Sequence, residues 1–115
     1  MKSYMIDKMS YNGYYISILK ESHPMGKVEC CSLPGYELRF NSLDHDPPHL
    51  HAHRVGEWEI KIDLRQTTRR QLVWKPAWPK SFPGPSVIVG RRLAALICDH
   101  REELLQEWDQ KVCPL

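Results

Sequence analysis

The sequence lacks a long apolar run and a strong excess of either charge. No apolar stretch approaches the roughly 18 residues that a membrane-spanning helix requires, and the N-terminus lacks the apolar core of a signal peptide. We therefore expect a cytoplasmic protein with no membrane contact. Sixteen Lys and Arg against 14 Asp and Glu give a formal charge of +2. This balance excludes the overall basicity typical of nucleic-acid-binding proteins, so any RNA contact has to be a local patch.

The spacing of the four cysteines excludes two common cysteine frameworks. Cys30, Cys31, Cys98 and Cys113 contain no CxxC pair and no convincing disulfide pattern. Reduced thiols agree with a cytoplasmic location. If residues 27–33 form a short strand, the adjacent Cys30 and Cys31 point to opposite faces. The sequence also lacks a Gly-rich phosphate loop, and its spacing indicates neither a Ser-His-Asp nor a Cys-His arrangement.

The length and composition predict one folded domain. A chain of 115 residues with 42% hydrophobic and 26% charged residues is typical of a globular unit with one modest core. We expect a single domain over residues 1–115, with an N-terminal hairpin extension at 1–34 and a core at 35–112. Residues 14–20 and 27–33 predict the two strands of the extension, with Pro24 and Gly26 in the turn between them.

Alternating side chains predict further strands. Residues 36–40 alternate apolar and polar side chains, which indicates a half-buried strand. Residues 57–64 carry the clearest alternation in the chain, since every second side chain is apolar. Pro47 and Pro48 keep the preceding loop from becoming helical, and Gly56 marks the bend of a hairpin between residues 49 and 64.

The length of the hairpin loop decides which way the histidines point. A two-residue loop would put them on the apolar face. A three-residue loop at 54–56 instead places Ala52 opposite Trp58 and Leu50 opposite Ile60, which pairs apolar side chains with each other. We therefore expect the histidines on the polar face. In this register His49, His51 and His53 lie beside Lys61, Glu59 and Glu57, respectively.

The C-terminal half predicts a long loop and a helix. Residues 65–85 contain four prolines and are not expected to form continuous regular structure, but Trp74, Trp78 and Phe82 favour an ordered lid. Ser86 is suited to cap a helix at 87–112, whose apolar stripe would cover the sheet, with His100 at the core edge. We predict an α+β fold, with an antiparallel sheet of four to five strands and one long C-terminal helix packed on one face.

The histidine row predicts a metal site. In a strand, His49 and His51 project from one face, as two imidazoles that share one Zn²⁺ must. His45, or more weakly Asp44 or Asp46, would complete the ligand set. His53 lies about 13 Å from His49 along a strand, so it cannot bind the same ion. The alternative interpretation is a solvated row of histidines held by hydrogen bonds to Glu57 and Glu59.

A second interpretation is RNA cleavage or binding. His49 and His51 would act as general base and general acid on a 2′-hydroxyl and a leaving oxygen. The residues expected to hold phosphate are Arg54, Lys61, Arg69 and Arg70, and those expected to stack bases are Trp74 and Trp78. The simpler interpretation is that both tryptophans pack as a lid over a solvated basic turn. A third class is a partner-binding module that uses the same loop aromatics as anchors.

Two stretches resemble a known family. "DHDPPHLHAHRVGEWEIKIDL" at 44–64 resembles the DH-x-PPH-apolar-H core of the small bacterial domain-of-unknown-function family 4160, and "HREELLQEW" at 100–108 resembles the end of its final helix. Gly35 sits where the family's first strand tends to begin. The resemblance covers about residues 35–108.

The chain departs from the family pattern in four respects. Residues 1–34 are extra, and the Trp- and Pro-rich connection before the helix is longer than usual. Leu96 stands where a Trp is common, and His53 lies outside the family core. The resemblance implies a component of a toxin-antitoxin-like module that acts through the histidine-rich loop and hairpin, beside a small protein partner encoded nearby. It implies no particular reaction.

Overall fold

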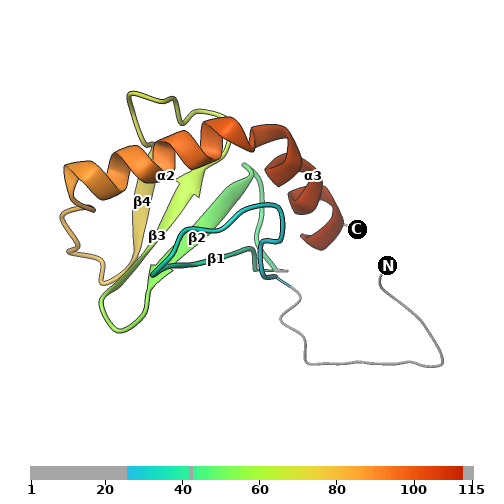
Figure 1. The fold of residues 1–115 in the computed structure, drawn as a ribbon. Helices are drawn as coiled ribbons and strands as arrows, with labels where there is room; N and C mark the ends of the chain where they lie inside the picture. The colour runs from blue at the N-terminus through green and yellow to red at the C-terminus, as the bar shows by residue number, and fades with distance from the viewer. Residues whose placement is uncertain (1–25, 42, 113–115) are drawn as a thin grey trace.

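The computed structural model describes residues 26–41 and 43–112 (Figure 1). The strand predicted at 14–20 and the turn at Pro24 lie outside the described residues. Within the described part the fold is α+β, as predicted, with one four-stranded antiparallel sheet and two helices. Neither of these helices is long and apolar enough to cross a membrane.

The sheet is a meander in which each strand pairs with the next along the chain. Its strands are β1 (Glu37–Arg39), β2 (His49–Arg54), β3 (Trp58–Asp63) and β4 (Trp74–Trp78), in that spatial order. The alternation expected for β3 is confirmed, because Trp58, Ile60 and Ile62 are buried while the side chains between them are not. The strand predicted at 27–33 does not form, since only Lys27 makes an isolated bridge, to Arg39.

The hairpin between β2 and β3 has three loop residues, as predicted, but they are Val55, Gly56 and Glu57. The Glu57 backbone N–H donates to the Arg54 carbonyl at 2.9 Å, and Gly56 takes the positive φ of 79° that the third position of such a turn requires. The predicted register was therefore wrong by two residues, although each side chain keeps its predicted face. His49, His51 and His53 lie opposite Asp63, Lys61 and Glu59, and Leu50 and Ala52 lie opposite Ile62 and Ile60.

The proline-rich segment is more regular than the sequence predicted. It contains β4, with Pro76 paired to Ile60. Since β4 is the edge strand of the sheet, the missing N–H of Pro76 can face solvent without breaking a ladder hydrogen bond. Phe82 from the same segment stacks on Trp58, with ring centroids 4.9 Å apart. The loop therefore packs onto the core, whereas the Trp78 side chain stays 52% exposed.

The prediction of one long C-terminal helix was wrong. Helix α2 (Val87–Asp99) ends at His100, and α3 (Arg101–Lys111) starts in a new direction (Figure 1). Ser86 caps α2 as predicted, since its side chain accepts a hydrogen bond from the Val89 N–H. The break accompanies a tertiary contact: the Arg101 guanidinium donates to the backbone carbonyls of Leu64, Arg65 and Thr67 at 2.6, 2.9 and 2.7 Å.

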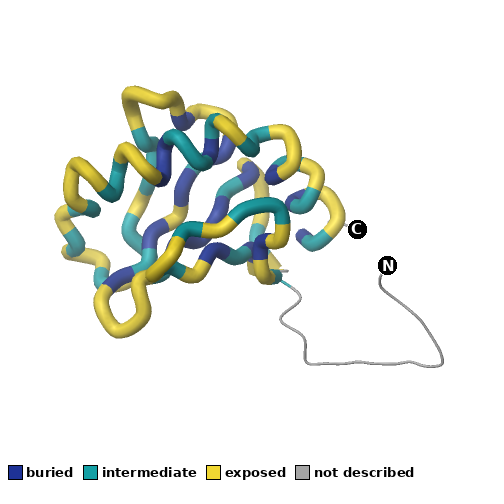
Figure 2. The backbone as a smooth tube through the Cα atoms, in the orientation of Figure 1, coloured by how far each residue is buried: buried dark blue, intermediate teal, exposed yellow. Residues whose placement is uncertain are grey.

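The core lies between α2 and the sheet. Figure 2 shows the buried residues concentrated along the strands beneath this helix, and the exposed residues along the hairpin loop. Helix α3 extends the core at the β1 side of the sheet, where the Trp108 and Phe40 rings pack in a T-shaped arrangement with centroids 5.9 Å apart. The fully buried aliphatic core residues are Leu50, Ala52, Ile60, Ile62, Leu64, Leu93, Ile97 and Leu104.

Two glycines give an internal test of this packing. A Cβ on Gly26 would collide with the Phe40 backbone carbonyl, whereas a Cβ on Gly90 in α2 would meet open space. We expect Gly26→Ala to lower the free energy of unfolding by about 1–3 kcal/mol, and Gly90→Ala to raise it by about 0.5–1 kcal/mol. Urea denaturation measures both. A neutral or stabilising Gly26→Ala would contradict the described approach of residues 26 and 40.

Candidate metal centre

The three histidines of β2 do not form a solvated row. All three alternate with the core residues Leu50 and Ala52, but the loop that precedes β2 covers two of them. The side chain of His51 is buried, and that of His49 is 16% exposed. His53 is the most open of the three, and it pairs with the exposed Glu37 at 3.3 Å.

The imidazole of His51 is held on both sides. Its Nδ1 lies 2.7 Å from Oε2 of Glu59, and a carboxylate there accepts, so this nitrogen carries the proton. Its Nε2 lies 3.2 Å from the Asn41 side-chain amide and 3.1 Å from Oδ2 of Asp44. The Asn41 amide can donate to a lone pair on Nε2. With Nδ1 protonated, the lone pair of the neutral His51 ring is on Nε2, the atom that faces both the Asn41 amide and Asp44.

The imidazole of His49 also has its Nδ1 atom against a hydrogen-bond acceptor. Its Nδ1 lies 3.0 Å from the Pro47 carbonyl oxygen, which can only accept a hydrogen bond. The lone pair of the neutral ring is therefore on Nε2. This atom is buried, and no described residue forms a hydrogen bond with it. It lies 3.4 Å from Oδ2 of Asp44, the same oxygen that the His51 ring approaches.

Asp44 is positioned by the local turn. Its backbone N–H donates to the Asn41 carbonyl at 3.0 Å, and its Oδ2 accepts a hydrogen bond from the Asn41 N–H at 3.1 Å. The turn thus brings one carboxylate oxygen over the start of β2. The ligand atoms of Asp44, His49 and His51 all lie within 4.8 Å of one another.

Two of the distances in this group fit a tetrahedral ion. Bonds of about 2.0–2.1 Å separate neighbouring ligand atoms by roughly 3.3 Å. The two nitrogen-to-oxygen distances to Asp44 are 3.1 and 3.4 Å. Two lone pairs directed at one carboxylate oxygen repel it unless a proton or a cation lies between them. The arrangement therefore provides an electron-rich, partly buried cluster suited to a metal ion.

The structure separates the other predicted ligands from this group. His45 and Asp46 are exposed and do not belong to it. Both line a small hollow of about 270 Å³, together with His49 and Lys61. Of the sequence-predicted candidates for a third ligand, only Asp44 joins the histidine pair.

The residues predicted to contact RNA or a partner are dispersed. Lys61 and Trp74 line the small hollow beside His49, and Trp74 also packs against Phe82. Arg54 pairs with Glu57 in the hairpin, and Arg69 pairs with Asp99 of α2. The remaining two, Arg70 and Trp78, are exposed.

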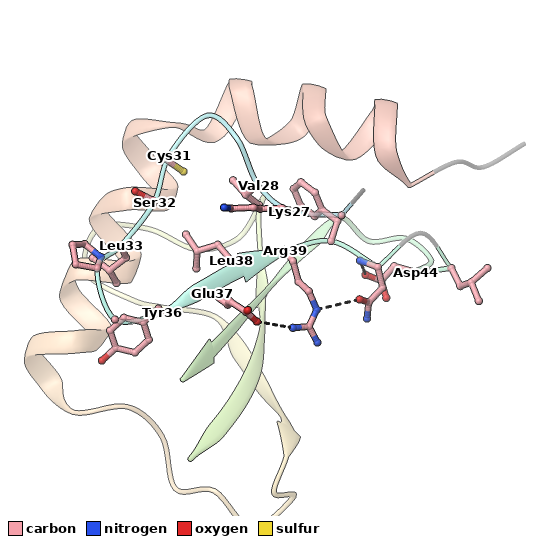
Figure 3. A pocket seen from close by; sticks show the side chains of 16 residues that line it. Lys27, Val28, Cys31, Ser32, Leu33, Tyr36, Glu37, Leu38, Arg39 and Asp44 are labelled. Atoms are coloured by element: carbon pink, nitrogen blue, oxygen red, sulfur yellow. Dashed lines mark hydrogen bonds and ion pairs between the residues drawn. The ribbon is translucent and has the colours of Figure 1, made fainter. Parts of the chain in front are cut away.

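A larger hollow adjoins Asp44 and is lined by β1 and the segments that flank it. It has a volume of about 980 Å³ and is lined by residues between Gly26 and Asp44. Figure 3 shows Cys31 and Asp44 on opposite sides of it, with Arg39 between them. The Arg39 guanidinium donates hydrogen bonds to the side chains of Glu37 and Asn41. Asp44 is thus the member of the cluster that borders this open space.

Two neighbours of the site were not predicted from the sequence. Asn41 contacts both Asp44 and His51, as described above. Trp108 of α3 packs on His49, with ring centroids 5.3 Å apart. The first precedes the motif by three residues, and the second is distant from it in sequence.

Comparisons with known proteins add no family to these observations. The chain matches no family model, no curated protein sequence and no solved structure. The site is therefore interpreted from its own contacts.

Proposed function

We propose that this protein binds one Zn²⁺ ion through Oδ2 of Asp44 and the Nε2 atoms of His49 and His51. One observation carries the proposal: both imidazoles have Nδ1 occupied by an acceptor, and both direct Nε2 at the same carboxylate oxygen. Two imidazole nitrogens and one carboxylate oxygen are an established zinc ligand set.

The outer contacts support this assignment. Ligating histidines commonly donate their second N–H to a carboxylate or a backbone carbonyl, which fixes the ring and raises its basicity. Here the Glu59 carboxylate accepts the hydrogen bond from His51, and the Pro47 carbonyl accepts that from His49. Arg39 in turn donates to the second oxygen of Glu59 at 3.1 Å. The outer shell thus extends across β1, β2 and β3.

The number of ligands favours an open zinc site. Three protein ligands leave a fourth position, as in catalytic zinc centres, and Asp44 borders the larger hollow. When bound, the ion would act as a Lewis acid toward a water or an anionic oxygen in that position. The same ligand set serves Fe²⁺ where several positions are open. The Trp108 ring packed on His49 leaves less room for further ligands, which favours four-coordinate Zn²⁺ instead.

The contacts of His49 and His51 suit metal binding better than they suit acid–base catalysis. Both Nδ1 atoms are occupied, and the His51 ring is too buried to meet a 2′-hydroxyl. Histidine-dependent RNA cleavage stays a prediction. A role in a toxin-antitoxin-like module with a small protein partner also stays a prediction, based on the family resemblance. The zinc proposal depends on neither.

The first test follows the ligands themselves. We expect Zn²⁺, titrated to saturation into metal-free protein, to shift the ring ¹⁵N signals of His49 and His51 in NMR spectra, because both Nε2 atoms become ligands. Asp44→Asn should weaken this binding by more than the roughly 10–100-fold typical of an outer-shell change. His53→Ala is the matched control on the same strand and should leave the binding unchanged. Unshifted His49 and His51 signals at saturating Zn²⁺ would refute the proposal.

The second test concerns the outer shell. Glu59→Gln replaces a charged acceptor by a neutral amide beside His51 and should lower Zn²⁺ affinity about 10–100-fold. Competition with a chelating dye measures the change. Glu57→Gln alters a carboxylate in the hairpin loop that pairs only with Arg54 among the described residues, and should have no effect. Equal affinities for the Glu59→Gln and Glu57→Gln variants would contradict the assigned role of Glu59.

A further inference from the structure

A second group of metal-ligating side chains lies at the start of α3. It consists of Cys30 and Cys31, from the segment before β1, and His100, at the break between α2 and α3. One ligand atom from each residue lies within 4.8 Å of the other two. None of these residues belongs to the Asp44 cluster, so the group requires its own explanation.

The two sulfur atoms are separated as metal-bound thiolates are. The Sγ atoms of Cys30 and Cys31 are 3.7 Å apart. A tetrahedral ion with bonds to sulfur of about 2.3 Å separates two thiolates by roughly 3.8 Å. Adjacent cysteines in a strand would point to opposite faces, so this proximity depends on the irregular backbone at residues 28–33.

Helix α3 holds that backbone in place. The Glu107 carboxylate accepts hydrogen bonds from the backbone N–H groups of Glu29 and Cys30, at 3.0 and 2.7 Å. Lys111, one turn further along, pairs with Glu107 at 3.1 Å and donates to the Lys27 carbonyl at 2.7 Å. These contacts occupy the backbone groups that a strand would have used.

The third member is oriented by a carboxylate. His100 Nδ1 lies 3.1 Å from Oε1 of Glu103, an interaction of the kind that fixes the rings of ligating histidines. Its side chain is one-third exposed, so an ion can reach the group from solvent. Two sulfurs and one imidazole nitrogen form a softer ligand set than that of the Asp44 cluster.

The environment argues against a reactive thiol. Burial raises the pKa of Cys30, and the neighbouring thiol and Glu107 raise it further. Burial likewise raises the pKa of Cys31, although the contact with Cys30 lowers it. Burial alone would raise the pKa of Glu107, but the backbone donors and Lys111 outweigh it, so this carboxylate stays ionised. Protonated thiols beside an anion are poor nucleophiles.

We propose that Cys30, Cys31 and His100 bind a thiophilic divalent ion, of the Zn²⁺ or Cd²⁺ class, at a site separate from Asp44. Binding replaces two S–H bonds by two metal–sulfur bonds and releases two protons to solvent. The bound ion would link the segment before β1 to the junction of α2 and α3. This proposal does not depend on the Zn²⁺ site in β2.

The test is a Cd²⁺ titration of the full chain carrying Asp44→Asn and His49→Ala, which disables the first cluster. We expect an ultraviolet sulfur-to-cadmium charge-transfer band that saturates at one equivalent. Adding Cys30→Ser and Cys31→Ser should abolish the band. The matched control, with Cys98→Ser and Cys113→Ser instead, keeps both proposed thiols and should retain the band at full intensity.

X-ray absorption at the cadmium edge provides a second measurement that does not require the Cys30 and Cys31 variants to fold. With one equivalent of Cd²⁺ on the chain carrying Asp44→Asn and His49→Ala, we expect sulfur ligation that persists when Cys98 and Cys113 are replaced by Ser. The proposal fails if no charge-transfer band forms, if the band survives loss of Cys30 and Cys31, or if the control chain shows fewer than two sulfur ligands.

Discussion

The hydrogen bonds at the Nδ1 atoms of His49 and His51 determine which nitrogen of each ring is available to a metal ion. The Pro47 carbonyl and the Glu59 carboxylate are acceptors, so His49 and His51 must turn Nε2 lone pairs toward Asp44. The buried Nε2 lone pair of His49 has no hydrogen-bond donor among the described residues, which costs about 1–3 kcal/mol, and the facing Asp44 carboxylate adds repulsion. A metal ion removes both penalties together. The loop before β2, the outer contact from Arg39 and the packing of Trp108 all maintain this arrangement.

Helix α3 connects the two candidate metal sites. Trp108 packs on His49 at one site, whereas Glu107 and His100 hold or complete the Cys30–Cys31 group at the other. The helix takes this position because the chain breaks at His100 and Arg101 binds three carbonyls beyond β3. Ion binding at the Cys30–Cys31–His100 group would therefore stabilise the docking of α3, since Glu107 of this helix holds the backbone that carries the two cysteines.

Much of the sheet could be predicted from local patterns, whereas tertiary contacts decided the rest. The alternation in 57–64 predicted β3 and the faces of the β2 histidines, and the H-x-H spacing predicted the His49–His51 pair. Asp44, and not His45, is the third member of the cluster because of a turn closed by Asn41, and the spacing of residues in the sequence does not reveal this turn. The helix break could not be predicted, because the apolar stripe continues through His100 and Arg101 acts on residues more than 30 positions away. The cysteine pair was missed because 27–33 was expected to be a strand, whereas Glu107 holds its backbone in another conformation.

The most direct test of this account is the tautomer of the two imidazoles in metal-free protein, measured by ¹⁵N-resolved NMR of the ring nitrogens at pH 8. The account predicts that the neutral rings of His49 and His51 both carry the proton on Nδ1, with an unprotonated Nε2 available for a metal. A proton on Nε2 of either neutral ring would contradict it, because that nitrogen would then donate to Asp44 and the cluster would be an ordinary hydrogen-bond network.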